Sequence, residues 1–174
     1  LHWPGLYGQA IATEEGLRAF SPYPRMAAAN LAVLHADAGD LAAAAVEFRL
    51  AWNRGPDDVG RDWAYTGTIS ALAEAATRLG LVSEANVLDE ILAPFDGQFL
   101  LSMCHQLRGS VSSLRAGLAR CVGQLDEAIV RYERAERFEH EQGADLLLAC
   151  TRVDLAAALV EREHTGDADR ARHL

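Results

Sequence analysis

A glycine recurs along the sequence at an almost constant interval, and this repetition limits the fold more than any other feature. Four glycines are separated by 41, 43 and 43 residues, and an alanine stands five residues after each of them. Glycine fits the left-handed backbone that ends a helix, and alanine lets two helices cross closely. The pattern therefore predicts four related helical hairpins. The glycines are Gly39, Gly80, Gly123 and Gly166, and the alanines are Ala44, Ala85, Ala128 and Ala171.

The residues on either side of these glycines have the period of an amphipathic helix. The apolar residues before Gly123 recur at 4-3-4-3 spacing, and those after it also share one side of a helix. Beyond the apolar side, Glu127 precedes Arg131 by four residues, and Glu133 precedes Arg137 likewise. Such pairs stabilise an exposed helix face by a few tenths of a kcal/mol, so we expect this face to be solvated. The two apolar sets are Leu107, Val111, Leu114, Leu118, Cys121 and Leu125, Ala128, Ile129, Tyr132, Ala135.

Turn-rich breaks divide the chain into segments. Residues 53–62 and 93–98 are rich in turn formers, and Pro56 and Pro94 end the helices before them. We expect hairpins at about 25–55, 62–95, 103–142 and 144–174, with the last one truncated, and no strand because no run alternates. Residues 1–24 are expected to be an irregular or shortened leading helix segment, and the chain as a whole to be a piece of a longer protein.

Composition excludes several classes of protein. Half of the 174 residues are hydrophobic and alanine is about a fifth, which suits closely packed helices. The net charge of −9 argues against a nucleic-acid surface, because phosphate binding needs clustered basic groups. No apolar run is long enough to span a membrane, and three widely spaced cysteines do not form a disulfide framework. We expect a cytoplasmic protein that contacts neither membrane nor nucleic acid.

No set of residues has the spacing that catalysis or metal binding needs. A carboxylate-bridged di-iron site requires two Glu-x-x-His motifs, and the chain offers one, at Glu161 and His164. Cys104 and His105 are adjacent and have no second ligand pair at zinc spacing. No nucleophile elbow occurs. We therefore expect no enzyme, no catalytic residue, no cofactor and no metal.

The repeat resembles the tetratricopeptide type. That pattern places an aromatic residue four positions after the alanine and another alanine three positions later, which Phe48 and Ala51 match, as do Tyr132 and Ala135. The second repeat departs with Asp89, and the period exceeds that family's 34 residues, as in HEAT-like pairs. The resemblance implies an all-α, right-handed solenoid of antiparallel helix hairpins, with a concave groove lined by the first helix of each pair. The groove residues expected to bind a partner are Ser70, Glu74, Thr77, Ser110, Ser113 and Arg120.

A longer similarity covers about residues 26–174. The segments "GSV", "VGQLDEA" and "EQGADLLLACTR" resemble the helical-repeat region of large actinobacterial LuxR-type or cyclase-linked AAA ATPase regulators. The resemblance implies a regulatory segment that binds a protein, a peptide or a small-molecule effector and controls an attached output module. The alternative is a structural scaffold that forms homo-oligomers through the ends of the solenoid. An apolar surface at the truncated last hairpin favours that alternative.

Overall fold

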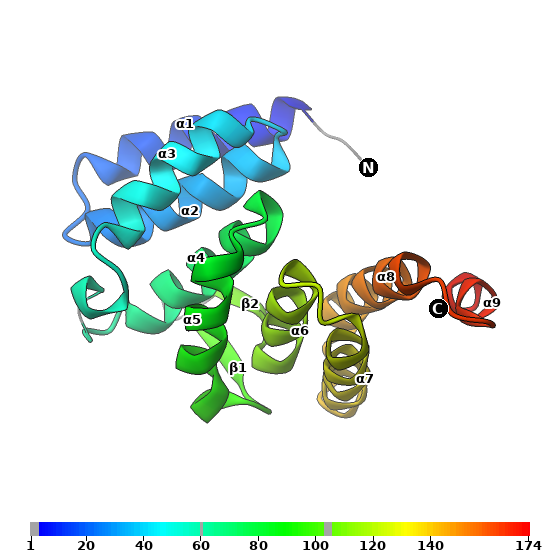
Figure 1. Ribbon diagram of the computed structural model, residues 1–174. Coiled ribbons are helices and arrows are strands. Elements are labelled where there is room, and N and C mark those ends of the chain that lie inside the picture. The colour runs from blue at the N-terminus through cyan, green and yellow to red at the C-terminus, as the bar shows by residue number, and fades with distance from the viewer. Residues whose placement is uncertain (1–3, 60, 103–105) are drawn as a thin grey trace. The chain divides into compact units, whose positions relative to one another are not determined.

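The computed structural model describes residues 4–59, 61–102 and 106–174, and most of these residues are helical (Figure 1). The prediction of a predominantly helical protein is confirmed. Nine α-helices, two short 3-10 helices and a two-stranded sheet lie within the described ranges. The helices are α1 (Pro4–Arg18), α2 (Pro24–Asp37), α3 (Leu41–Trp52), α4 (Tyr65–Leu79), α5 (Val82–Leu92), α6 (Val111–Cys121), α7 (Leu125–Glu141), α8 (Asp145–Arg162) and α9 (Asp167–Arg172). The remaining elements are η1 (Pro56–Asp58), η2 (Ala93–Phe95), β1 (Phe99–Ser102) and β2 (Gln106–Ser110).

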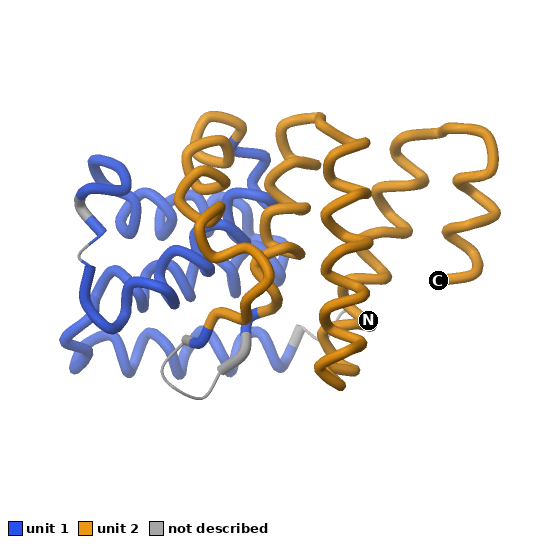
Figure 2. Tube along the Cα trace, turned by 90° about the horizontal axis from the view of Figure 1, so that it is seen from below, with its two compact units in different colours: residues 1–81, 101–108 blue, residues 82–100, 109–174 orange. Residues whose placement is uncertain are grey.

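The chain divides into two compact units (Figure 2). Unit 1 holds residues 1–81 and 101–108, and unit 2 holds residues 82–100 and 109–174. The repeat spacing predicted a single array over 25–174, but the two helices of the expected hairpin 62–95 belong to different units, α4 to unit 1 and α5 to unit 2. The reason lies in the packing, because α4 buries its side chains against α2 and α3 whereas α5 packs on α6.

Unit 1 is built around α2 and α4. Helix α2 packs against α1, α3 and α4, and its small side chains let all three approach closely. Residues 1–24 were expected to be irregular or shortened, but α1 is a helix of 15 residues that packs on α2. Arg18 at the end of α1 also forms an ion pair with Glu47 of α3 at 2.9 Å. The buried residues of α2 are Met26, Ala27, Ala28, Ala29, Leu31, Ala32 and Val33.

In unit 2, each helix packs on the next one along the chain. Helix α5 contacts α6, α6 contacts α7, α7 contacts α8, and α8 contacts α9. The core is formed where α8 lies against α6 and α7, so helices of different hairpins share one apolar cluster. That cluster comprises Ala116, Ala119, Ala128, Ile129, Tyr132, Leu155, Ala158 and Leu159.

The repeated glycines and alanines occupy the positions that the sequence predicts. All four glycines have a positive φ, between 67° and 90°. Ala44, Ala85 and Ala128 have no solvent-exposed surface, whereas Ala171 is half-buried. Asp89, which stands where the other repeats carry Phe48 or Tyr132, forms ion pairs instead of apolar contacts, with Arg115 at 2.8 Å and Arg131 at 2.7 Å.

The hairpin of β1 and β2 was not expected, because the sequence shows no alternating run. It also displaces the expected third hairpin, which begins at α6 rather than near residue 103. Ser110 explains this start, since its hydroxyl accepts a hydrogen bond from the backbone N–H of Ser113 and caps α6. The backbone N–H of Val111 also donates to the carbonyl of Gln98, at 2.9 Å.

Candidate functional site

All six residues expected to bind a partner make polar contacts within the chain. Ser70 and Ser110 are completely buried, so their placement on a partner-binding surface is wrong. The Ser70 hydroxyl donates to the carbonyl of Gly67, and the Ser110 hydroxyl donates to Glu139. A short polar side chain on a helix can satisfy itself on the backbone one turn away, which the sequence pattern does not reveal. Thr77 behaves likewise and donates to the carbonyl of Ala73.

Glu74 and Ser113 are also paired with other residues of the chain. Glu74 forms ion pairs with Arg78 and Arg108. Ser113 accepts a hydrogen bond from the hydroxyl of Thr151, at 3.2 Å, and so joins α6 to α8. Ser70, Glu74 and Thr77 belong to unit 1, and the other three residues belong to unit 2.

Of the six residues expected to bind a partner, Arg120 lines a groove in unit 2. The groove has a volume of about 760 Å³, and its floor is formed mainly by alanines of α8 and α9. Three charged residues also line it: Arg120 from the end of α6, Glu161 from α8 and Arg172 from α9. Small side chains on a groove floor leave room for bulky apolar groups of a partner. The apolar lining residues are Ala156, Ala157, Val160, Ala168 and Ala171.

The apolar lining continues along α8 as a stripe of exposed side chains that was not predicted from the sequence. We define the α8 stripe as Leu146, Cys150, Val153, Ala157 and Val160, which recur at 4-3-4-3 spacing. Leu146, Val153 and Val160 are 78%, 69% and 58% exposed. The opposite face of α8 is buried in the core of unit 2. Helix α8 is therefore apolar on two opposite faces, one buried in the core and the other exposed along the stripe.

Charged residues border the groove and the stripe. Arg120 donates to Glu161 at 2.6 Å, and Arg172 pairs with Asp169. Burial lowers the pKa of Arg120, but the hydrogen bond and the charge of Glu161 outweigh it, so the pKa is raised above its ordinary value. The Arg120 guanidinium is therefore charged at every physiological pH.

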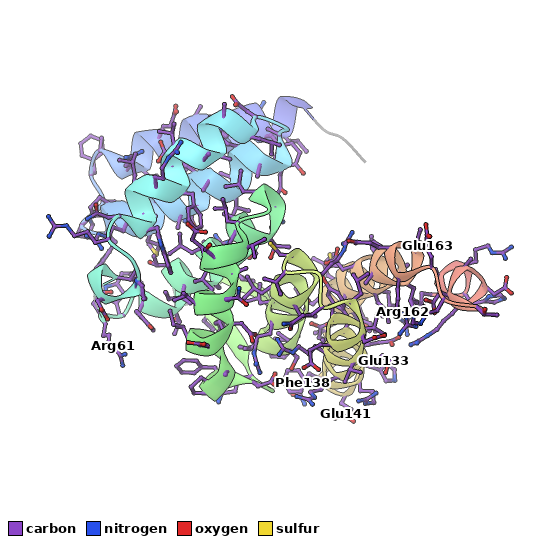
Figure 3. The ribbon with its side chains drawn as sticks, viewed as in Figure 1. Arg61, Glu133, Phe138, Glu141, Arg162 and Glu163 are labelled. Carbon is purple, nitrogen blue, oxygen red and sulfur yellow. The ribbon has the colours of Figure 1, made fainter. Side chains whose placement is uncertain are left out.

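The end of α8 orients α9 and leaves an acidic residue exposed. Arg162 donates to both carboxylate oxygens of Asp167, at 2.9 and 2.7 Å, and to Asp126 at 2.8 Å. Glu163 follows in a left-handed conformation with a φ of 58° and is exposed (Figure 3). No ion pair with Glu163 occurs within the part of the chain that the structure describes.

The thiol of Cys150 is the one reactive group on the α8 stripe. Burial raises its pKa, and the negative charges of Asp154 and Glu139 raise it further. A thiol with a raised pKa remains protonated at neutral pH and is a poor nucleophile. Cys150 therefore contributes to the stripe as a small apolar side chain.

A second group of charged residues joins α5, η2, α6 and α7 in unit 2. Asp96 accepts hydrogen bonds from Ser112, Arg115 and Arg134, and Arg131 bonds both Asp89 and Glu127. The sequence predicted the pair of Glu127 with Arg131. It also predicted Glu133 with Arg137, but Glu133 pairs with Arg170 of α9 at 2.7 Å. These ion pairs join elements of unit 2 to one another, and we assign them no binding role.

Neither metal ligation nor a membrane segment is observed in the described ranges. Over residues 4–59, 61–102 and 106–174, no group of three His, Cys, Asp or Glu side chains is arranged to hold a metal ion. None of the helices described is sufficiently long and apolar to cross a membrane. Cys104 and His105, which lack the spacing of zinc ligands in the sequence, lie outside the described residues. No family model matches the sequence, and no curated protein and no solved structure matches it either.

Proposed function

We propose that this chain is a non-catalytic helical-repeat segment that binds a partner protein or peptide through the exposed face of unit 2. The observation that carries the proposal is the groove with its adjoining α8 stripe, which together form an exposed apolar surface on α8 and α9. Apolar side chains gathered on one exposed face are a recurrent mark of interaction sites.

Repetition supports the architecture that the proposal needs. Ala44, Ala85 and Ala128 are fully buried beside the turns at Gly39, Gly80 and Gly123, so related local geometry recurs along the chain. Units of this kind bury their apolar faces against neighbouring units. We therefore propose a solenoid of antiparallel helix hairpins, right-handed and tetratricopeptide-like.

The resemblance to LuxR-type and cyclase-linked bacterial regulators suggests what the binding serves. In this proposal the segment is regulatory, acts in the cytoplasm and controls an attached output module. A partner changes that module only if it binds one conformation of the segment more tightly than another. The mechanism therefore requires the bound partner to alter the packing of α8 and α9, the helices that line the groove.

Selection from a displayed library of random peptides tests the binding function. Peptides enriched on the immobilised chain are synthesised, labelled and titrated with the free chain by fluorescence anisotropy. We expect saturable binding with a Kd on the order of 10 µM, which weakens when Ala157→Arg fills the groove floor. Ala42→Arg, on an exposed position of α3, is the matched control. Absence of any saturable peptide would contradict the function.

Self-association is a second candidate function, favoured by the same exposed side chains of Leu146, Val153 and Val160. A scaffold of this kind would bury the α8 stripe against another copy. Light scattering over a concentration series distinguishes the two, since a chain that stays monomeric at the highest concentration excludes the scaffold.

A further inference from the structure

In unit 1, the side chain of Arg108 on β2 meets acceptors from two helices. Its guanidinium donates from Nη1 to Oε1 of Glu74 on α4, at 3.3 Å, and from Nη2 to Oδ1 of Asn30 on α2. The side chains of Arg108 and Glu74 are only 14% and 16% exposed, so the ion pair is largely removed from water. A strand residue is therefore held on the helices of unit 1 by its charged end group.

Bonds that do not involve Arg108 hold the two acceptors in place. The amide nitrogen of Asn30 donates to Glu14 of α1, at 3.1 Å, and so orients the amide oxygen towards the guanidinium. The second carboxylate oxygen of Glu74 accepts from Arg78, at 3.4 Å. Helices α2 and α4 thus present one fixed amide oxygen and one fixed carboxylate oxygen, which suit the planar fork of a guanidinium.

Arg108 does not satisfy all of its own donors at this place. Its Nε atom is buried and has no hydrogen-bond partner in the described part of the chain. A buried N–H without an acceptor costs free energy, because it has lost water and gained no other partner. The backbone of β2 fixes the point from which Arg108 reaches its acceptors, whereas an arginine on another chain is not bound to that point. Arg108 is therefore an imperfect occupant of a well-formed site.

Acids outnumber the bases that remain around the site when Arg108 is left out. Arg78 is shared between Glu74 and Asp37, to which it donates at 2.5 Å. Glu14 accepts from the neutral amide of Asn30, and it forms no ion pair within the described ranges. Three carboxylates and one arginine therefore surround the two acceptors, and such a group attracts a cation.

We propose that Asn30 and Glu74 form a binding site for an arginine side chain of a partner protein, and that Arg108 occupies this site as an autoinhibitor. The group that the site already holds identifies the ligand's chemistry, which is a guanidinium carried on an extended strand. The inference goes beyond the proposed function, because the site lies in unit 1 and uses no residue that lines the groove of unit 2. A partner enters only when Arg108 leaves, which lowers its apparent affinity.

A second attachment keeps the β-hairpin on unit 1 when Arg108 leaves its acceptors. The hydroxyl of Thr66 on α4 donates to the backbone carbonyl of Leu101 on β1, at 3.2 Å. This bond does not depend on the side chain of Arg108. We therefore expect Arg108→Ala to keep the fold and to empty the site.

A peptide with the sequence of β2 tests the proposal on the full chain. Fluorescein-labelled QLRGS is titrated by fluorescence anisotropy against the wild type and Arg108→Ala. We expect the variant to bind the peptide at least about tenfold more tightly, because the competing side chain is gone. Peptides with lysine or citrulline in place of arginine should bind this variant at least about fivefold more weakly, since lysine lacks the planar fork and citrulline lacks the charge.

Matched variants assign the effect to this site. Arg49→Ala, at an exposed position of α3, removes the same charge and should leave the affinity at the wild-type value. Added to Arg108→Ala, Glu74→Gln should weaken the binding of QLRGS by about tenfold, because the charged acceptor is lost. Glu15→Gln, at an exposed position of α1, should not weaken it. Circular dichroism checks the helix content, and Arg108→Gln replaces Arg108→Ala if the alanine variant unfolds.

Two results would overturn the inference. Equal affinity of Arg108→Ala and Arg49→Ala for QLRGS would show that Arg108 is only a structural tie between β2 and the helices. Tighter binding to Arg108→Ala that Glu74→Gln does not weaken would place the peptide elsewhere on the chain. The proposed function is tested separately, because Ala157→Arg in the groove of unit 2 should leave the binding of QLRGS unchanged.

Discussion

Single residues are most constrained where a polar side chain is buried, and Ser110 with Glu139 is the sharpest case. Glu139 is fully buried, and the Ser110 hydroxyl donates to its Oε1 at 2.7 Å. Its Oε2 has no hydrogen-bond partner within the described part of the chain. Ser110→Ala removes this bond together with the cap of α6, so we predict a loss of about 2 kcal/mol in the free energy of unfolding, measured with urea.

Two further variants test the origin of that loss. Glu139→Gln keeps an acceptor for Ser110 and removes a buried charge, so it should cost less than Ser110→Ala. Ser83→Ala, at an exposed position of α5, should change stability by less than about 0.5 kcal/mol. If Glu139→Gln proved as damaging as Ser110→Ala, the buried carboxylate itself would be a stabilising element.

Glycine substitutions give a second prediction at the residue scale, with opposite signs at two positions. Gly80 ends α4 at φ 67° and ψ 34°, and a Cβ there would meet nothing within 4 Å. Gly80→Ala should therefore destabilise by about 1 kcal/mol through the backbone alone. Gly16 lies inside α1 with equally open surroundings, so Gly16→Ala should stabilise by about 0.5 kcal/mol or more. Thermal unfolding of both variants measures the difference, and two effects of the same sign would contradict it.

Elements are joined by charge in unit 2, and Asp96 is central to that connection. Burial alone would raise the pKa of Asp96, but the hydrogen bond from Ser112 and the charges of Arg115 and Arg134 outweigh it, so the pKa is lowered. A carboxyl whose pKa is lower in the folded state stabilises the fold above its unfolded pKa, and the effect is lost as the pH falls towards the folded value. We predict that stability declines below about pH 4 and that Asp96→Asn makes the decline shallower.

Urea unfolding at pH 7 and pH 3 measures this effect for both proteins. At pH 7 the variant should be the less stable, because the two arginines lose a charged partner. The difference between wild type and variant should shrink at pH 3. Should it stay constant over this range, Asp96 would not be responsible for the pH dependence.

Elements also show how far the sequence determines the fold. The glycine and alanine spacing predicted the turns at Gly39, Gly80, Gly123 and Gly166. Glycine is favoured where φ is positive, and alanine is favoured where two helices pack closely, so both leave a local signal in the sequence. The hairpin of β1 and β2 was not predictable, since four- and five-residue strands leave too short a pattern. The α8 stripe was hidden because an apolar residue in a sequence does not say which neighbouring helix covers it. For the same reason, only Arg120 of the six expected site residues lines the groove.

At the scale of the whole molecule, the net charge of −9 shapes which partners approach the groove. The sixteen basic residues, all arginines, are outnumbered by 25 acidic residues, so the surrounding field is acidic. Long-range attraction of this kind acts on the association rate and is screened by salt, over about 10 Å at 0.1 M. Stopped-flow mixing with a basic peptide from the library selection should show the association rate constant fall about tenfold between 20 mM and 500 mM NaCl, with a smaller change in dissociation. An acidic peptide from the same selection should show the opposite trend, because salt relieves its repulsion. A rate constant that does not depend on salt for either peptide would mean that contact at the α8 stripe, and not the charge of the chain, governs the encounter.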